Sequence, residues 1–211
     1  LPVLSTAERD TFGMRDRADA IPPATRSPEP NQGTPRPLWS PRRLREDERG
    51  AKVKKYLQQQ FDSYVKDLET LTNIDSGNGD PAGTDRAAKF VGEKLQALGA
   101  TVEYRTNPRS SHLIARLKGK GTFRLLLIAH IDTVFKPGEA AKRPFWLDEK
   151  NIAYGPGVGD DKATVIQTIY ALKTLKEYDF DAFGEIILYY NGEEEGGSPT
   201  AEAIVAELSP Q

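Results

Sequence analysis

Residues 125–134 have the sequence LLLIAHIDTV, an apolar run that ends abruptly at two polar side chains, His130 and Asp132. A short apolar run of this kind is typical of a parallel strand that is buried on both faces. In open α/β sheets, ligands bind beyond the carboxyl ends of such strands. We therefore predict that this segment is a buried strand of an α/β domain and that His130 lies at the functional edge of the sheet.

The spacing of His130 and Asp132 suits a metal site. Side chains two residues apart in an extended strand point to the same face, so Asp132 could hold one nitrogen of the imidazole while the other nitrogen binds a metal ion. The alternative is a histidine at a strand end beside a solvated aspartate. One histidine and one aspartate at this spacing do not distinguish the two interpretations.

The composition restricts the possible functions. The chain has 211 residues, 29 basic and 31 acidic side chains, a net charge of -2 and no cysteine. This balance gives no support to binding of nucleic acid or of an anionic membrane. Without cysteine, any metal site must use histidine and carboxylate ligands. We find no segment apolar enough to span a bilayer and no secretory signal, so the compartment stays open, with the cytoplasm slightly favoured.

Residues 1–50 differ in composition from the rest of the chain. They contain 8 of the 15 prolines, and all nine of their basic residues are arginine. The prolines interrupt any helical or strand period. We predict that residues 1–50 are a disordered or non-native segment and that residues 51–211 form the folded domain.

Residues 51–211 alternate between helical and strand patterns, which predicts an α/β domain. The expected helices span about residues 51–74, 84–98 and 161–178. The expected strands span about residues 101–105, 113–118, 124–129 and 185–191. A hairpin is expected around residues 145–154, because two short apolar segments flank a polar turn there.

The chain has two histidines, His112 and His130. His112 precedes a predicted strand and has no acidic neighbour in the sequence. We expect it to be a surface or strand-end residue rather than a ligand.

A second polar motif follows the predicted hairpin, where residues 155–162 have the sequence GPGVGDDK. A glycine-rich turn before a helix can bind phosphate at the helix N-terminus. This turn lacks the Gly-Lys-Ser/Thr of a P-loop and places Asp160 and Asp161 where phosphate would lie, so a cation is favoured. For Asp161 we prefer the simpler role of helix N-cap.

The third motif follows the last predicted strand, where residues 191–198 have the sequence NGEEEGGS. Its three carboxylates, Glu193, Glu194 and Glu195, would repel one another unless a positive group lay nearby. A solvated acidic turn is the alternative for this motif taken alone.

Taken together, the motifs favour a metal centre. His130, Asp160 and the pair Glu194 and Glu195 each follow a strand or a hairpin, at what should be one edge of one sheet. Imidazole and carboxylate groups suit zinc or a similar divalent ion.

The three motifs, at residues 130–134, 155–162 and 191–198, resemble the signature motifs of the aminoacylase/carboxypeptidase family of two-zinc metallopeptidases. The chain is most similar to the glutamate carboxypeptidases of this family, over about residues 53–208. The resemblance implies an α/β three-layer sandwich with a mixed, mostly parallel sheet and helices on both faces. Residues 51–211 would be the N-terminal part of this catalytic domain, incomplete at the C-terminus.

The resemblance also implies a role for each motif residue. His130, Asp160 and Glu195 would bind metal, with Asp160 bridging two zinc ions. Asp132 would orient His130, and Glu194 would be the general base. The implied reaction is hydrolysis of an amide bond in N-acyl amino acids or small peptides, with release of a C-terminal glutamate. Zinc is the expected cofactor, with two ions in a complete site and cobalt or manganese as alternatives.

Members of this family continue well beyond the position of Gln211. They supply a further carboxylate ligand, a late histidine ligand and an inserted domain that forms a homodimer. We therefore expect this chain to be a truncated part of a homodimeric hydrolase and to be inactive alone. The alternative is a non-catalytic remnant that binds a cation, or a partner protein through an open sheet edge.

Overall fold

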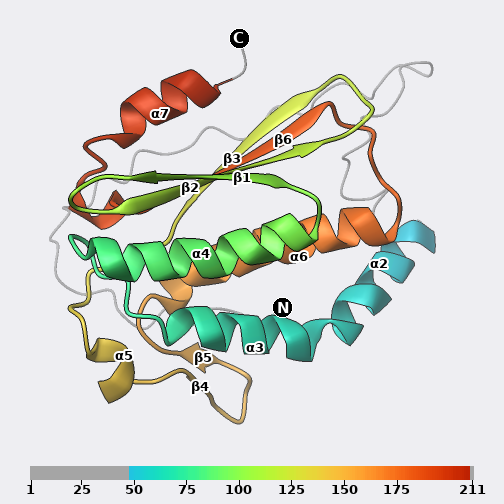
Figure 1. The fold of residues 1–211 in the computed structure, drawn as a ribbon. Helices are drawn as coiled ribbons and strands as arrows, with labels where there is room; N and C mark the ends of the chain where they lie inside the picture. The colour runs from blue at the N-terminus through green and yellow to red at the C-terminus, as the bar shows by residue number, and fades with distance from the viewer. Residues whose placement is uncertain (1–47, 210–211) are drawn as a thin grey trace, which may run out of the picture.

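The computed structural model describes residues 48–209, which form a sheet with helices on both faces (Figure 1). The predicted disordered or non-native segment, residues 1–50, lies almost entirely outside the described residues. Residues 48–50 are helical, so the first helix begins slightly before the predicted start of the folded domain.

The observed elements agree with most of the predicted ones. The helices are α2 (Glu48–Gln59), α3 (Phe61–Thr72), α4 (Pro81–Ala97), α5 (Glu139–Lys142), α6 (Ala163–Glu177) and α7 (Ala201–Leu208), with two short helical turns, η1 (Val158–Lys162) and η2 (Glu194–Gly196). The strands are β1 (Thr101–Thr106), β2 (Ser111–Lys118), β3 (Arg124–His130), β4 (Trp146–Leu147), β5 (Ala153–Tyr154) and β6 (Glu185–Asn191). The predicted hairpin is confirmed as the antiparallel pair of β4 and β5. Among residues 48–209, no helix has both the length and the apolar character needed to cross a bilayer.

The helix predicted over residues 51–74 is divided in two at Gln60. The chain changes direction there, so the axes of α2 and α3 are at an angle to each other (Figure 1). On α2, Tyr56 packs edge-on against Tyr178 at the end of α6, with the ring centroids 6.1 Å apart. The apolar pattern of residues 51–74 contains no sign of this bend, because α2 and α3 both pack against α6.

Helix α4 shows how local sequence sets helix ends. The side chain of Asp80 accepts a hydrogen bond from the N–H of Gly83 at 3.0 Å, and Pro81 occupies the first helical position. An aspartate N-cap followed by proline is a strong start signal, so the helix begins before the predicted Thr84. Gly99 has a positive φ of 95°, which is typical of a glycine that ends a helix.

The strand order is β1-β2-β6-β3. The predicted α/β fold with a mixed sheet is confirmed, but the expectation of a mostly parallel sheet is wrong for these residues. The pairs β1 with β2 and β2 with β6 are antiparallel, and only β3 with β6 is parallel. Residues 107–110 join β1 to β2, and so short a connection permits only an antiparallel pair.

The strand predicted to be buried on both faces, β3, lies at the edge of the sheet. Leu125 is 41% exposed and Ile128 is 54% exposed. Strand β6 takes an inner position instead, and all of its residues are buried. The apolar run predicted a strand correctly, but the neighbours of that strand are determined by chain segments far from it in sequence.

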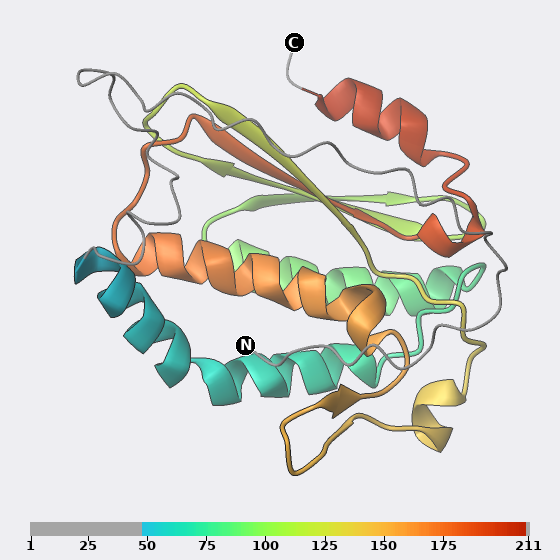
Figure 2. The ribbon, with the colours of Figure 1, turned by 180° about the vertical axis from the view of Figure 1, so that it is seen from behind.

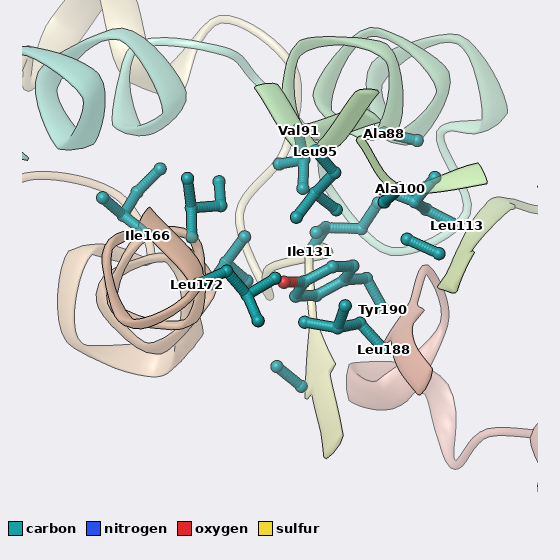
Figure 3. Packing of buried hydrophobic residues seen from close by; sticks show 14 of the residues in the cluster. Ala88, Val91, Leu95, Ala100, Leu113, Ile131, Ile166, Leu172, Leu188 and Tyr190 are labelled. Atoms are coloured by element: carbon teal, nitrogen blue, oxygen red, sulfur yellow. The ribbon is translucent and has the colours of Figure 1, made fainter. Parts of the chain in front are cut away.

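The core has a part on each face of the sheet. Helices α4 and α6 cover one face, and α7 covers the other (Figures 1 and 2). On the first face, Leu95 of α4 and Ile166 and Leu172 of α6 lie in one cluster with Leu188 and Tyr190 of β6 (Figure 3). The cluster under α7 consists of Ile114, Ile187, Tyr189, Ala201, Ile204 and Leu208. Alternate residues of β6 therefore serve the two clusters, which holds this strand rigidly between them.

Candidate metal centre

The three polar motifs converge because β3 and β6 are parallel neighbours. His130 and Asn191 are paired in register at the carboxyl ends of the two strands. The chain segments that follow them therefore leave the sheet at the same edge. Asp160, in the turn η1 that leads into α6, reaches the same place through a contact with His130.

The predicted ligands and the predicted base lie close together. The Nε2 atom of His130 is 2.9 Å from Oδ1 of Asp160 and 3.9 Å from Oε2 of Glu194. One donor atom each from His130, Glu194 and Glu195 lie within 4.8 Å of one another. His130 is buried, whereas the side chain of Asp160 is 82% exposed. The group is thus anchored in the sheet on one side and open to solvent on the other.

Asp132 is fully buried and holds the turn that carries the two glutamates. Its Oδ1 accepts a hydrogen bond from the N–H of Glu194, and its Oδ2 accepts one from the N–H of Glu195, both at 3.0 Å. The side-chain amide of Asn78 donates to the same Oδ2 at 3.1 Å. The carboxylate therefore connects the end of β3 to the turn after β6.

Asp132 also contacts His130, mainly through its backbone. The Nδ1 atom of His130 lies 3.1 Å from the carbonyl oxygen of Asp132 and 3.4 Å from its Oδ1. This contact leaves Nε2 directed at Asp160 and Glu194. A hydrogen-bond partner that fixes one ring nitrogen is typical of histidines that bind metal through the other.

The preferred role of Asp161 as an N-cap is wrong. Helix α6 begins at Ala163, and Asp161 lies in η1 with non-helical backbone angles. Its Oδ2 accepts a hydrogen bond from the backbone N–H of His130 at 3.3 Å. The Asp160–Asp161 peptide bond is cis. Asp161 thus belongs to the surroundings of His130 rather than to the start of the helix.

The pKa values of the site residues reflect the negative charge that surrounds His130. Burial alone would lower the pKa of His130, but hydrogen bonds to Asp132 and Asp160 outweigh it and raise the pKa to about 9. Burial and the charge of Asp160 raise the pKa of Glu195. Burial would also raise the pKa of Asp132, but the hydrogen bonds that it accepts lower it instead. Crowded carboxylates that stabilise a positive charge on His130 would stabilise a metal cation in the same way.

Comparison with known proteins supports the family resemblance of these motifs. Residues 126–211 match the model of peptidase family M20/M25/M40. The chain is 38% identical over 149 residues to carboxypeptidase G2 of Pseudomonas sp. (strain RS-16), in an alignment that covers 68% of this chain and 35% of that relative. The predicted metallopeptidase resemblance is confirmed. The chain spans about a third of the length of this relative.

Solved structures show the same fold. The di-peptidase Dug1p from Saccharomyces cerevisiae has a TM-score of 0.63 at 18% identity, over 74% of this chain and 37% of that chain. The M20 family metallo-carboxypeptidase Sso-CP2 from Sulfolobus solfataricus has a TM-score of 0.59 at 22% identity, over 68% of this chain and 34% of that chain. Residues 48–209 therefore have the α/β fold of M20-type peptidase domains.

His112 lies at the start of β2, one of the two positions expected for it, but the alternative of a surface position is wrong, because its side chain is only 1% exposed. Its ring stacks on that of Tyr189 with the centroids 5.9 Å apart, and the hydroxyl of Tyr189 lies 3.1 Å from its Nδ1. Burial lowers the pKa of His112. Its neighbours come from β6 and from the turn after β6, so nearby sequence could not reveal this environment.

Three further polar residues near the site were not predicted. Asn78 lies in a loop rich in glycine and aspartate, and such a composition by itself indicates only a turn. Glu193 is 1% exposed although it belongs to an acidic motif that is elsewhere open to solvent. Lys162 is also 1% exposed, and its ammonium donates a hydrogen bond to the carbonyl oxygen of Ile74 at 2.8 Å. Its position within the GPGVGDDK motif was the one available signal.

Proposed function

We propose that the three motifs form the metal centre of a peptidase that hydrolyses an amide bond in N-acyl amino acids or small peptides. One observation carries this proposal. His130, Asp160, Glu194 and Glu195 meet at the carboxyl edge of the parallel strands, and the buried carboxylate of Asp132 lies behind them. A site at this edge is where α/β sheets bind ligands.

The donor set fits zinc. Imidazole nitrogen and carboxylate oxygen are both ordinary zinc ligands. His130, Asp160 and Glu195 would hold the metal, with Asp160 shared between two ions in a complete site. The fixed Nδ1 of His130 leaves its Nε2 available, which supports this assignment. Cobalt or manganese could replace zinc, because both accept the same kinds of ligand.

When bound, zinc acidifies water and polarises the carbonyl of the scissile amide. Glu194 is exposed beside His130, where its carboxylate can accept a proton from water and return it to the leaving amine. Asp132 supports this role by accepting the backbone N–H of Glu194. Glu195, whose N–H binds the other oxygen of Asp132, serves as a ligand instead. The buried aspartate thus allows two adjacent glutamates to have different functions.

We propose a carboxypeptidase reaction that releases C-terminal glutamate. The identity to carboxypeptidase G2 supports the carboxypeptidase class. The preference for glutamate is suggested by the resemblance of the motifs to the glutamate carboxypeptidases. In a chain of the relatives' full length, we expect the homodimer that the same resemblance implies.

For these 211 residues alone, we propose weak zinc binding and little activity. His130, Asp160 and Glu195 are three ligands for two ions, whereas each zinc is usually bound by about four ligands, including water. The chain also covers only 35% of the length of carboxypeptidase G2.

Calorimetric titration with zinc tests the metal centre. We expect measurable binding by the wild type and at least about tenfold weaker binding by His130→Ala and by Glu195→Gln. Asp148→Asn is the matched control, because Asp148 contacts only its own hairpin and should not affect zinc binding. Equal affinity of the wild type and His130→Ala would rule out the proposed site.

A chimera tests the reaction. Residues 51–211 would be fused to the part of carboxypeptidase G2 that lies beyond the alignment, and cleavage of an N-acyl glutamate would be followed with and without zinc. We expect zinc-dependent cleavage that Glu194→Gln abolishes. A folded chimera that binds zinc without cleaving any amide would favour the alternative, a non-catalytic cation-binding protein.

A further inference from the structure

A second cluster of polar side chains lies beside the turn that carries Glu194 and Glu195. Its centre is formed by Glu193 and His112, which are each 1% exposed. Neither residue belongs to the proposed set of metal ligands. Burying a carboxylate and an imidazole is costly unless they are hydrogen-bonded, so their partners indicate what the cluster does.

The carboxylate of Glu193 receives four hydrogen bonds. Its Oε1 accepts from the backbone N–H and from the hydroxyl of Thr200, both at 2.6 Å. Its Oε2 accepts from the side-chain amide of Asn107 and from the hydroxyl of Ser110, both at 3.3 Å. Asn107 and Ser110 belong to the β1–β2 connection, and Thr200 immediately precedes α7. Glu193 therefore ties the turn to the β1–β2 connection, which is distant from it in sequence, and to the nearby residue that precedes α7.

His112 continues this network to the backbone of the turn. The N–H of Gly192 donates to its Nδ1 at 3.2 Å. Because a backbone N–H cannot accept, Nδ1 must be unprotonated, and the ring proton must lie on Nε2. That Nε2 is 3.1 Å from the hydroxyl of Ser110 and 3.2 Å from that of Thr200, and both hydroxyls donate to Glu193. A continuous chain of hydrogen bonds thus joins Gly192 to Glu193 through His112.

The turn is held from two directions. The carbonyl oxygen of Glu193 accepts from the N–H of Gly196 at 3.2 Å and from that of Ser198 at 3.0 Å, which closes the turn. From β3, Asp132 accepts the N–H groups of Glu194 and Glu195. The backbone that carries Glu194 and Glu195 is therefore held by hydrogen bonds within the turn, by Asp132 of the segment after β3 and by the network around Glu193 and His112.

We propose that Glu193 and His112 are positioning residues of the metal centre, which fix the turn so that Glu194 and Glu195 face His130. This inference rests on the proposed function, because it assigns the turn to metal binding. Groups that hold metal ligands in place affect metal affinity by about 10- to 100-fold when they are altered. A network that served only to stabilise the fold would not affect the ligand atoms selectively.

Three substitutions separate these possibilities. Glu193→Gln keeps the side-chain size but removes the charge, and Thr200→Val removes one of the two hydroxyls that join His112 to Glu193. Glu185→Gln is the matched control, because Glu185 is a buried glutamate at the opposite end of β6 that binds Arg124. If Glu193→Gln does not fold, Thr200→Val provides the same comparison with a smaller change.

Two measurements are made on the full 211-residue chain. Zinc affinity is measured by calorimetry with zinc alone, and hydrogen exchange of the Glu194 and Glu195 amides is measured by NMR on metal-free protein. We expect Glu193→Gln and Thr200→Val to weaken zinc binding at least about tenfold and to accelerate exchange at both amides relative to Leu188, in the buried centre of β6. Glu185→Gln should leave the zinc affinity unchanged and should not accelerate exchange at the Glu194 and Glu195 amides relative to Leu188.

The outcomes distinguish this inference from the proposed function. Wild-type zinc affinity in both Glu193→Gln and Thr200→Val would overturn the inference alone. Equal acceleration of exchange at Leu188 would also overturn it, because the network would then be stabilising the whole fold. Absence of zinc binding by the wild type would overturn the proposed function and this inference together.

Discussion

Replacing Asp132 by asparagine tests the organisation of the site most directly. The carboxylate is fully buried and accepts N–H groups at both oxygens, from Glu194 at Oδ1 and from Glu195 and Asn78 at Oδ2. Asparagine has the same shape but only one oxygen. In either orientation, the amide NH2 would face at least one backbone N–H, and that donor would lose its acceptor.

The expected loss of stability follows from these bonds. A buried donor without a partner costs about 1–3 kcal/mol, and a hydrogen bond to a charged group contributes about 1.5–3 kcal/mol. Because these two figures overlap in part, we expect Asp132→Asn to lower the free energy of unfolding of the metal-free chain by about 3 kcal/mol at neutral pH. The substitution should also weaken zinc binding, since the turn would no longer be held.

The loss should depend on pH. The pKa of Asp132 in the folded chain is below its ordinary value of 3.8. Its stabilising effect is therefore complete above that ordinary pKa and disappears as the pH falls through the lower folded-state value. The difference in stability between the wild type and Asp132→Asn should thus shrink below about pH 4.

Urea denaturation followed by circular dichroism measures these differences. Asp80→Asn is the matched control, because Asp80 caps α4 through one bond to Gly83 and asparagine caps helices equally well. We expect this control to change the free energy of unfolding by less than about 0.5 kcal/mol. If Asp132→Asn loses no more stability than Asp80→Asn, the account of Asp132 as the support of the turn is refuted.

Three further substitutions test other parts of the domain. Glu185→Gln should lower the free energy of unfolding by about 2 kcal/mol at neutral pH, because Arg124 loses a charged acceptor. Although burial would raise the pKa of Glu185, the hydrogen bond from Arg124 holds it below 4.5, so urea denaturation should show a smaller loss in acid. Burial lowers the pKa of Lys162 to about 8, against an ordinary 10.5. Between these two pH values the unfolded chain therefore binds more protons than the folded chain. The free energy of unfolding of the wild type, relative to that of Lys162→Met, should rise with pH across this range. A difference that does not change with pH would contradict this. In Gly192→Ala the new Cβ would overlap the carbonyl oxygen of Ser111, so thermal denaturation should show a loss of about 2 kcal/mol, and wild-type stability would show that the contact can relax.

The sequence by itself determined the local features of this domain. Asp80 and Pro81 begin a helix and Gly99 ends it, because caps and allowed backbone angles depend on a few adjacent residues. The positions of the strands and of the three polar motifs could be predicted for the same reason. The clustering of His130 with Asp160 was predictable only in outline, from the rule that functional residues follow strands.

The tertiary structure decided which segments became neighbours. Strand β3 lies at the edge of the sheet because its one strand partner among the described residues is β6, which follows it by more than fifty residues. His112 is buried because β6 and the turn after it pack around its ring. Asp161 contacts the backbone of His130 rather than capping α6. These outcomes depend on the free energy of packing and hydrogen bonding between distant segments, which no local pattern of residues contains.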